Sequence, residues 1–141
     1  MGLPGSGKTT FAEKLKNAFE SKGVIPSWFN ADKIRTAFDD WDFTEEGRLR
    51  QAKRMRELVD KSIYPYCIVD MIAPTKKTRT LLKPDYLIWM NTIGEGRFDD
   101  TNEMFCPPGA NEINLMIPQW EVVDQVAQDI ANAWFPQHEG K

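Results

Sequence analysis

Short apolar runs alternate along this chain with stretches in which apolar residues recur every three or four positions. The runs predict β-strands over residues 24–29, 67–72, 86–90 and 113–117. Pro26 makes the first of these an edge strand, because proline cannot donate to a sheet ladder. The two middle runs are continuously apolar, which is typical of parallel strands buried on both faces.

The periodic stretches predict amphipathic helices. The first carries Phe11, Leu15 and Phe19 on one face and ends at Gly23. Further helices are expected over residues 32–38, from an N-cap at Thr44 to about residue 60, and over residues 120–134. Strands that alternate with helices indicate an α/β fold, with a parallel β-sheet sandwiched between α-helices.

Composition indicates one ordinary globular domain over residues 1–141. A net charge of -3 argues against a protein that mainly coats nucleic acid or an anionic membrane. Cys67 and Cys106 are too few for a disulfide or zinc framework, and no apolar run reaches the length of a membrane span. We therefore expect a cytoplasmic, reduced protein.

Two segments are predicted to lack regular structure. Residues 94–112 are rich in glycine and proline and predict a loop, and residues 136–141, which include His138, predict a polar tail.

The start of the chain matches the P-loop pattern G-x-x-x-x-G-K-S/T, whose backbone N–H groups wrap the phosphates of a nucleotide. Lys8 supplies positive charge toward the β- and γ-phosphates, and the Thr9 hydroxyl is a ligand for Mg²⁺. The pattern predicts ATP as co-substrate, bound by Gly2, Leu3, Pro4, Gly5, Ser6, Gly7, Lys8, Thr9 and Thr10.

A P-loop normally joins a buried central strand to a helix, and here only Met1 precedes Gly2. We expect that strand to lie upstream of the printed sequence. The alternative is a sheet that packs without its middle strand.

Asp32 and Arg35 follow the first predicted strand, at the sheet edge where α/β proteins bind ligands. A carboxylate that orients the hydroxyl of an acceptor is a recurring part of kinases, so Asp32 is a candidate base. Arg35 would hold an anionic acceptor. The alternatives are a helix cap for Asp32 and a solvated surface side chain for Arg35.

The next predicted helix is strongly basic, and helical geometry divides its charges between two sides. Arg48 shares a side with Gln51 and Met55 and is kept as a site residue. The remaining cations are expected to face solvent near Glu45, Glu46 and Glu57; they are Arg50, Lys53, Arg54 and Arg56.

Four collinear segments within residues 2–93 resemble the adenylylsulfate kinase family of P-loop NTPase fold, which makes phosphoadenylyl sulfate from ATP and adenylyl sulfate during sulfate assimilation. They are GLPGSGKTT, NADKIR, FTEEGRLRQAKRMREL and IVDMIAPTKKTR. The resemblance implies that Asp32 is the base and that Arg35 and Arg48 hold the sulfate and phosphate of the acceptor. By the same resemblance, the adenine and acceptor pocket is completed by Phe43, Gln51, Ile72 and Pro74.

Departures from the family pattern bear on mechanism. Ala73 stands where the family has a serine, and it cannot carry a phosphoryl group, which leaves direct in-line transfer. Asn30 and Ala31 replace Asp-Gly of the family. Asp70 stands where the family has a small polar residue; because it ends an apolar strand, it fits an aspartate that reaches Mg²⁺ through water, or a carboxylate that caps the strand end.

The basic lid of the family is not recognisable after Asn91. A loop over residues 94–105 could take its place, with Arg97 on the transferred phosphate and Phe98 or Phe105 on the adenine. The alternative is a surface loop with incidental aromatic residues.

Together these features predict a kinase that uses Mg²⁺ and ATP and phosphorylates a hydroxyl of a small anionic acceptor, most simply adenylyl sulfate. One alternative is a kinase for a modified nucleotide, a nucleic-acid end or another metabolite. The other is a nucleotide-binding module without transfer activity. No membrane partner is expected, nucleic acid is disfavoured, and a homodimer stays open.

Overall fold

The computed structural model describes residues 1–96 and 98–136 of the chain, and it contains two pairs of parallel strands. In the first pair, β1 (Ser27–Asn30) lies beside β2 (Cys67–Asp70), with Asn30 opposite Asp70. In the second, β3 (Ile88–Met90) lies beside β4 (Leu115–Ile117). The prediction of parallel strands is confirmed. Among the described residues β1 pairs only with β2, as expected of an edge strand, and Pro26 lies just before it.

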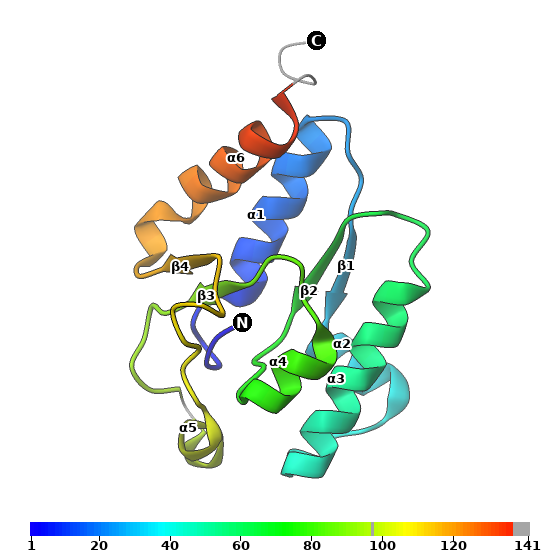
Figure 1. Ribbon diagram of the computed structural model, residues 1–141, viewed down its shortest axis with the longest axis vertical. Helices are drawn as coiled ribbons and strands as arrows, with labels where there is room; N and C mark the ends of the chain where they lie inside the picture. The colour runs from blue at the N-terminus through cyan, green and yellow to red at the C-terminus, as the bar shows by residue number, and fades with distance from the viewer. Residues whose placement is uncertain (97, 137–141) are drawn as a thin grey trace.

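Helices cover both sides of the strands (Figure 1). On one side α1 (Lys8–Ser21) packs against α6 (Val123–Trp134), which follows a single turn of 3₁₀-helix, η1 (Trp120–Val122). On the other side α3 (Glu45–Asp60) packs against α4 (Lys76–Leu82). Two cores result, one around Phe11 and Phe19 and the other around Met55 and Met71. The arrangement confirms the α/β fold with helices on both sides of parallel strands.

The prediction of the helix from Thr44 to residue 60 is confirmed, because the Thr44 hydroxyl accepts a hydrogen bond from the Gly47 backbone N–H at 3.1 Å. Helix α2 (Ala31–Phe38) is likewise close to its predicted bounds. Helix α4 was not predicted. The residue that indicates the start of this helix in the sequence is Thr75. Its hydroxyl caps the helix, and together with Thr78 it forms a capping box.

The prediction of a loop over residues 94–112 is wrong in part, because α5 (Asp99–Met104) lies within it. The helix is too short to show a periodic apolar face. Two carboxylates in its first turn, Asp99 and Asp100, favour it electrostatically.

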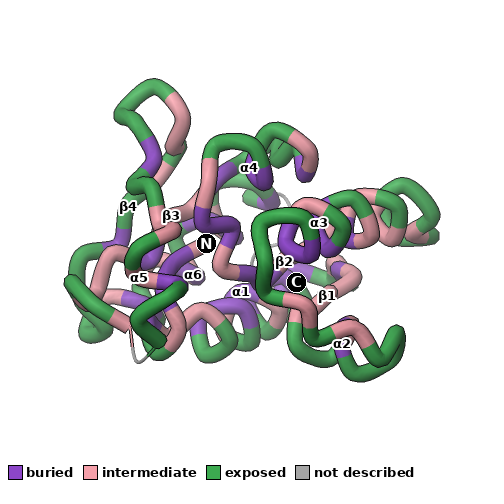
Figure 2. The backbone as a smooth tube through the Cα atoms, turned by 90° about the horizontal axis from the view of Figure 1, so that it is seen from below, coloured by how far each residue is buried: buried purple, intermediate pink, exposed green. Residues whose placement is uncertain are grey.

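The strands are shorter and less buried than the continuous apolar runs indicated. Ile68, Val69 and Ile88 are only half-buried, and Figure 2 shows β1 and β3 largely as partly buried backbone. The reason is that β2 and β3 do not pair with each other in the described part of the chain; Met1 and Gly2 lie between them. Within the described residues, no helix is both long and apolar enough to cross a bilayer.

Candidate active site

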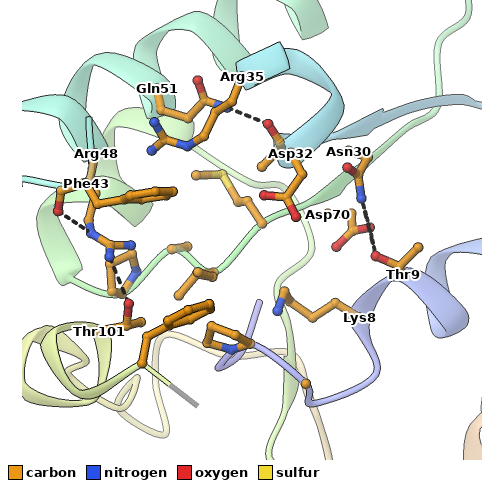
Figure 3. Close-up of a pocket in the computed structure, with 18 of the residues that line it drawn as sticks. Lys8, Thr9, Asn30, Asp32, Arg35, Phe43, Arg48, Gln51, Asp70 and Thr101 are labelled. Carbon is orange, nitrogen blue, oxygen red and sulfur yellow. Dashed lines mark hydrogen bonds between the residues drawn. The ribbon is translucent and has the colours of Figure 1, made fainter. Parts of the chain in front are cut away.

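One cavity of about 420 Å³ opens at the carboxyl ends of β1 and β2 and extends from the P-loop to α3. Figure 3 shows Lys8 and Thr9 at one end and Phe43 and Arg48 at the other, with Asp32 between them. The structure brings most of the predicted site residues to this cavity: Pro4, Gly5, Gly7, Lys8, Thr9, Thr10, Asp32, Arg35, Phe43, Arg48, Gln51, Asp70, Ile72 and Pro74.

The P-loop leads directly into α1, and its glycines take the left-handed backbone that the turn requires. Gly5 has φ 86° and Gly7, the N-cap of α1, has φ 94°. The backbone N–H groups at the start of α1 are therefore presented to the cavity as an anion site. The Lys8 ammonium donates to the Leu3 carbonyl at 3.0 Å across the loop.

Three residues of the P-loop that were predicted to bind ATP are buried and do not line the cavity: Gly2, Leu3 and Ser6. In the structure their contacts fix the loop to the rest of the domain. The Ser6 carbonyl accepts hydrogen bonds from the Thr92 hydroxyl and the Trp120 indole N–H, both at 2.7 Å. Sequence reasoning missed Thr92 and Trp120, because they lie far from Ser6 in the chain and belong to no phosphate-binding pattern.

Asp70, Thr9 and Asn30 form a polar cluster beside the P-loop. The buried Asp70 carboxylate accepts hydrogen bonds from the Thr9 hydroxyl and from the Asn30 side-chain amide, each at 2.8 Å. A hydroxyl and a carboxylate at this place fit Mg²⁺ carried by nucleotide phosphates, since such ions are held by few protein ligands. The described residues contain no group of three or more His, Cys, Asp or Glu side chains that could hold a metal ion.

Asp32 lies in the first turn of α2, exposed toward the cavity. The alternative role of Asp32 as the helix cap is wrong, because the Asn30 side chain accepts the capping hydrogen bond from the Lys33 backbone N–H at 3.0 Å. The Asp32 carboxylate therefore does not cap the helix. It points into the space between the P-loop and α3 (Figure 3).

Phe43 lies between two guanidinium groups at the far end of the cavity. The Arg35 guanidinium carbon is 4.6 Å from the ring centroid and that of Arg48 is 5.3 Å from it. Arg35 and Arg48 are 4% and 5% exposed, so the alternative of a solvated Arg35 is wrong. Burial lowers the pKa of both groups; Asp40 opposes this at Arg35, and Asp100 opposes it at Arg48. Arginine stays charged at neutral pH even so.

Backbone carbonyls and one hydroxyl hold the two arginines. Arg35 donates to the carbonyls of Asp40 and Asp42, at 2.9 and 3.2 Å. Arg48 donates to the Phe43 carbonyl at 3.0 Å and to the Thr101 hydroxyl of α5 at 2.9 Å. Sequence reasoning missed Thr101, and it lines the cavity together with Phe98 and Asp100. Phe105 does not line it, and the predictions for Arg97 and His138 lie outside the described residues.

The other basic residues of α3 do not all face solvent as predicted. The Asp40 carboxylate accepts hydrogen bonds from Arg50 at 2.8 Å and from Arg54 at 3.0 Å. The Arg54 side chain is only 15% exposed, and Arg56 pairs with Asp60 at 2.8 Å. Their partners are thus carboxylates brought in by the α2–α3 connection and the end of α3, not Glu45, Glu46 or Glu57.

We expect acidification to destabilise the protein through Asp40. Hydrogen bonds from Arg50 and Arg54 hold the pKa of this carboxyl below its ordinary value of 3.8. A carboxyl of this kind stabilises the folded state above its unfolded pKa, and the contribution is lost as the pH falls through the folded pKa. The free energy of unfolding of Asp40→Asn should therefore lie below that of the wild type at neutral pH and approach it in acid. Urea unfolding at a series of pH values measures this difference.

The matched control is Asp39→Asn, since Asp39 is the exposed C-cap of α2 and has no ion pair among the described residues. Asp39→Asn removes no ion pair of the described residues, so its free energy of unfolding at neutral pH should stay close to that of the wild type. The same pH dependence in both variants would contradict the assignment to Asp40.

The loop after β2 is fixed by Arg79 of α4. Arg79 is 3% exposed and donates to the carbonyls of Ala73 and Cys106, at 2.8 and 3.0 Å, and to the Glu112 carboxylate at 2.5 Å. Ala73 lines the cavity in a left-handed conformation, with φ 48°. Arg79 therefore ties the cavity wall around Ala73 to the segment that follows α5.

The fold and the glycine loop place this chain in the class of P-loop NTPase domains. A model of the family described as Adenylylsulphate kinase matches residues 1–86, more than half of the chain. The chain belongs to this family.

Two curated relatives and one solved structure are similar to it. A probable adenylyl-sulfate kinase of Aeropyrum pernix is 33% identical over 87 residues, and the match covers 58% of this chain and 46% of that protein. An adenylyl-sulfate kinase of Klebsiella pneumoniae is 29% identical over 100 residues, 69% of this chain and 46% of that protein. The chain thus spans about half the length of these relatives.

The structure of the Mycobacterium tuberculosis APS kinase in complex with AMPPNP and APS superposes with a TM-score of 0.76. The match covers 95% of this chain and 94% of that one, at 17% identity, and shows a common fold.

Proposed function

We propose that this chain is an ATP-dependent kinase that transfers the γ-phosphoryl group to the 3'-hydroxyl of adenylyl sulfate, in sulfate assimilation in the cytoplasm. The observation that carries the proposal is the single cavity that joins a P-loop to Phe43 and its two buried arginines, with Asp32 between. Membership of the adenylylsulfate kinase family supports the same reaction.

In this proposal the two ends of the cavity bind two nucleotides. The N–H groups at the start of α1 and the Lys8 ammonium bind the phosphates of ATP. Thr9 would hold Mg²⁺ directly, and Asp70 through water. When bound, Mg²⁺ neutralises charge that develops on the transferred group. At the other end Phe43 stacks on the adenine of the acceptor, and Arg35 and Arg48 hold its anionic groups.

Asp32 orients the acceptor hydroxyl and accepts its proton. The new bond joins the hydroxyl oxygen to the γ-phosphorus as the bond from that phosphorus to the bridging β–γ oxygen breaks, and ADP leaves. Transfer is direct, because Ala73 has no hydroxyl on which a phosphoenzyme could form. Catalysis is then mainly positioning and charge neutralisation.

The test is a transfer assay with radiolabelled ATP and Mg²⁺, offering adenylyl sulfate beside AMP and short oligonucleotides. We expect label on adenylyl sulfate and little on AMP, which lacks the sulfate. Label on oligonucleotides only would favour another acceptor. ATP binding without any transfer would favour the binding module. Arg50 and Arg54, two of the cations that could contact a nucleic acid, form ion pairs with Asp40 instead.

We expect Phe43→Ala to weaken acceptor binding and spare ATP. Loss of an aromatic stacking surface costs about 1–3 kcal/mol per base, or about 5- to 150-fold in KM for adenylyl sulfate. The Phe43 side chain is 41% exposed, so the fold should tolerate the change. Steady-state kinetics with each substrate varied in turn measure the effect.

The matched control is Phe38→Ala, because Phe38 also lies against an arginine, at 4.4 Å from Arg54, but is not among the residues that line the cavity. Equal changes in KM for adenylyl sulfate in the two variants would remove Phe43 from the proposed acceptor site.

A further inference from the structure

Helix α5 brings a negative charge to the end of the cavity that holds the two arginines. The Thr101 hydroxyl of this helix accepts a hydrogen bond from the Arg48 guanidinium at 2.9 Å, and Thr101 is only 3% exposed. Figure 3 shows this contact at the end of the cavity opposite Lys8. Asp100, the residue before Thr101, also lines the cavity. The helix therefore places a carboxylate close to a group that is proposed to hold the anions of the acceptor.

A hydrogen bond fixes the place of the Asp100 side chain. Its Oδ1 atom accepts from the Thr101 N–H at 2.9 Å, so the carboxylate is tied to the turn that contacts Arg48. Asp100 is exposed, and it forms no ion pair among the residues that the structure describes. Its charge nevertheless acts on Arg48, because it opposes the lowering of the Arg48 pKa that burial causes.

The carboxylates of the described residues that line the cavity are those of Asp32, Asp70 and Asp100. Asp70 lies beside the P-loop and Asp32 lies between the two ends (Figure 3), so Asp100 is the one tied to the acceptor end. That end thus combines the guanidinium groups of Arg35 and Arg48 with one carboxylate. Such a set favours anionic groups that carry a single charge, because a further negative charge on the ligand would be repelled by Asp100.

We propose that Asp100 is a specificity-determining residue, which makes the acceptor end discriminate against a terminal dianion and so keeps ADP out of the place of adenylyl sulfate. This inference rests on the proposed function. The two nucleotides share adenosine and its 5'-phosphate and differ in the terminal group. The sulfate carries one negative charge, whereas a terminal phosphate carries about one and a half to two near neutral pH. ADP is released in the same cavity, so it is the competitor that this charge would exclude.

The test measures binding and not transfer. Mg²⁺ and an excess of AMPPNP occupy the P-loop and leave little free metal, and radiolabelled adenylyl sulfate is then displaced by ADP. A second competitor is the β-fluoro derivative of ADP, in which fluorine replaces a terminal oxygen and leaves one charge on that group. The wild type should bind this derivative more tightly than ADP.

Asp100→Asn removes the charge and keeps an oxygen that can accept from the Thr101 N–H. We expect the ratio of the Kd for ADP to the Kd for adenylyl sulfate to fall by about three- to tenfold, the effect of one charge at an exposed position. The ratio for the β-fluoro derivative should hardly change, and the shift for ADP should shrink at high salt. Asp100→Glu keeps the charge and should keep the wild-type ratio.

The matched control is Asp99→Asn, which removes the same charge from the same helical turn, while Asp99 does not line the cavity. Its ratio should stay at the wild-type value. An unchanged ratio in Asp100→Asn, or equal shifts in the two variants, would overturn the assignment to Asp100 and leave the proposed function intact. Failure of adenylyl sulfate to bind the wild type would contradict both.

Discussion

Replacing Asp32 by asparagine is expected to slow phosphoryl transfer by about a hundredfold to ten-thousandfold, the range for a group that takes a proton in the transition state. The side chain keeps its size and loses the charge that accepts the hydroxyl proton. Affinity for ATP should hardly change, because the P-loop and not Asp32 binds the phosphates. Single-turnover transfer to adenylyl sulfate and a separate ATP titration measure the two quantities.

Asp39→Asn is the control, since Asp39 caps the opposite end of the same helix and does not line the cavity. It should transfer at the wild-type rate. An Asp32→Asn protein as fast as this control would remove Asp32 from the chemistry. A protein that loses ATP binding as well would indicate a role in the nucleotide site.

Replacing Lys8 by alanine is expected to reduce kcat/KM for ATP by about a hundredfold or more, the usual loss when a positioned donor to developing charge is removed. Lys8 lies at the P-loop end of the cavity, half-buried, where its ammonium can reach bound phosphates. Steady-state ATP turnover and thermal unfolding, measured together, separate loss of catalysis from loss of the fold.

The control for Lys8 is Lys14→Ala in the same helix, where the Lys14 ammonium pairs with Asp124 of α6 at 2.6 Å and does not line the cavity of the P-loop. The Asp124 side chain is exposed to solvent, so little stability should be lost. A Lys8→Ala protein that turns over ATP as fast as Lys14→Ala would contradict the proposed role of the P-loop.

The phosphate end of the site was predictable because its parts are contiguous. The glycines, Lys8 and Thr9 occupy one turn and the start of one helix, so their spacing along the chain already determines their geometry. The place of Asp32 followed in the same way, from a short apolar run and the helix after it. The roles of all these residues remain predictions until the variants are measured.

The contacts that hold the site together were not predictable, because they join residues far apart in the chain. Trp120 and Thr92 reach the Ser6 carbonyl across 114 and 86 positions, and Thr101 reaches Arg48 across 53. The ion partner of Arg50 and Arg54 was missed because it lies outside the helix that carries them. Helical spacing favoured Glu45, Glu46 and Glu57, but the connection before α3 folds back and brings Asp40 to Arg50 and Arg54.

By itself, the sequence determined the alternation of strands and helices, the P-loop and the family to which the chain belongs, because apolar periodicity and local motifs depend on neighbouring residues. Only the tertiary structure decided that Asn30 caps α2, so that the Asp32 side chain faces the cavity. It also decided that Thr101 of α5 contacts Arg48, and that β2 and β3 do not pair with each other among the described residues. These features depend on how separate elements pack, and packing is set by shape and burial over the whole chain.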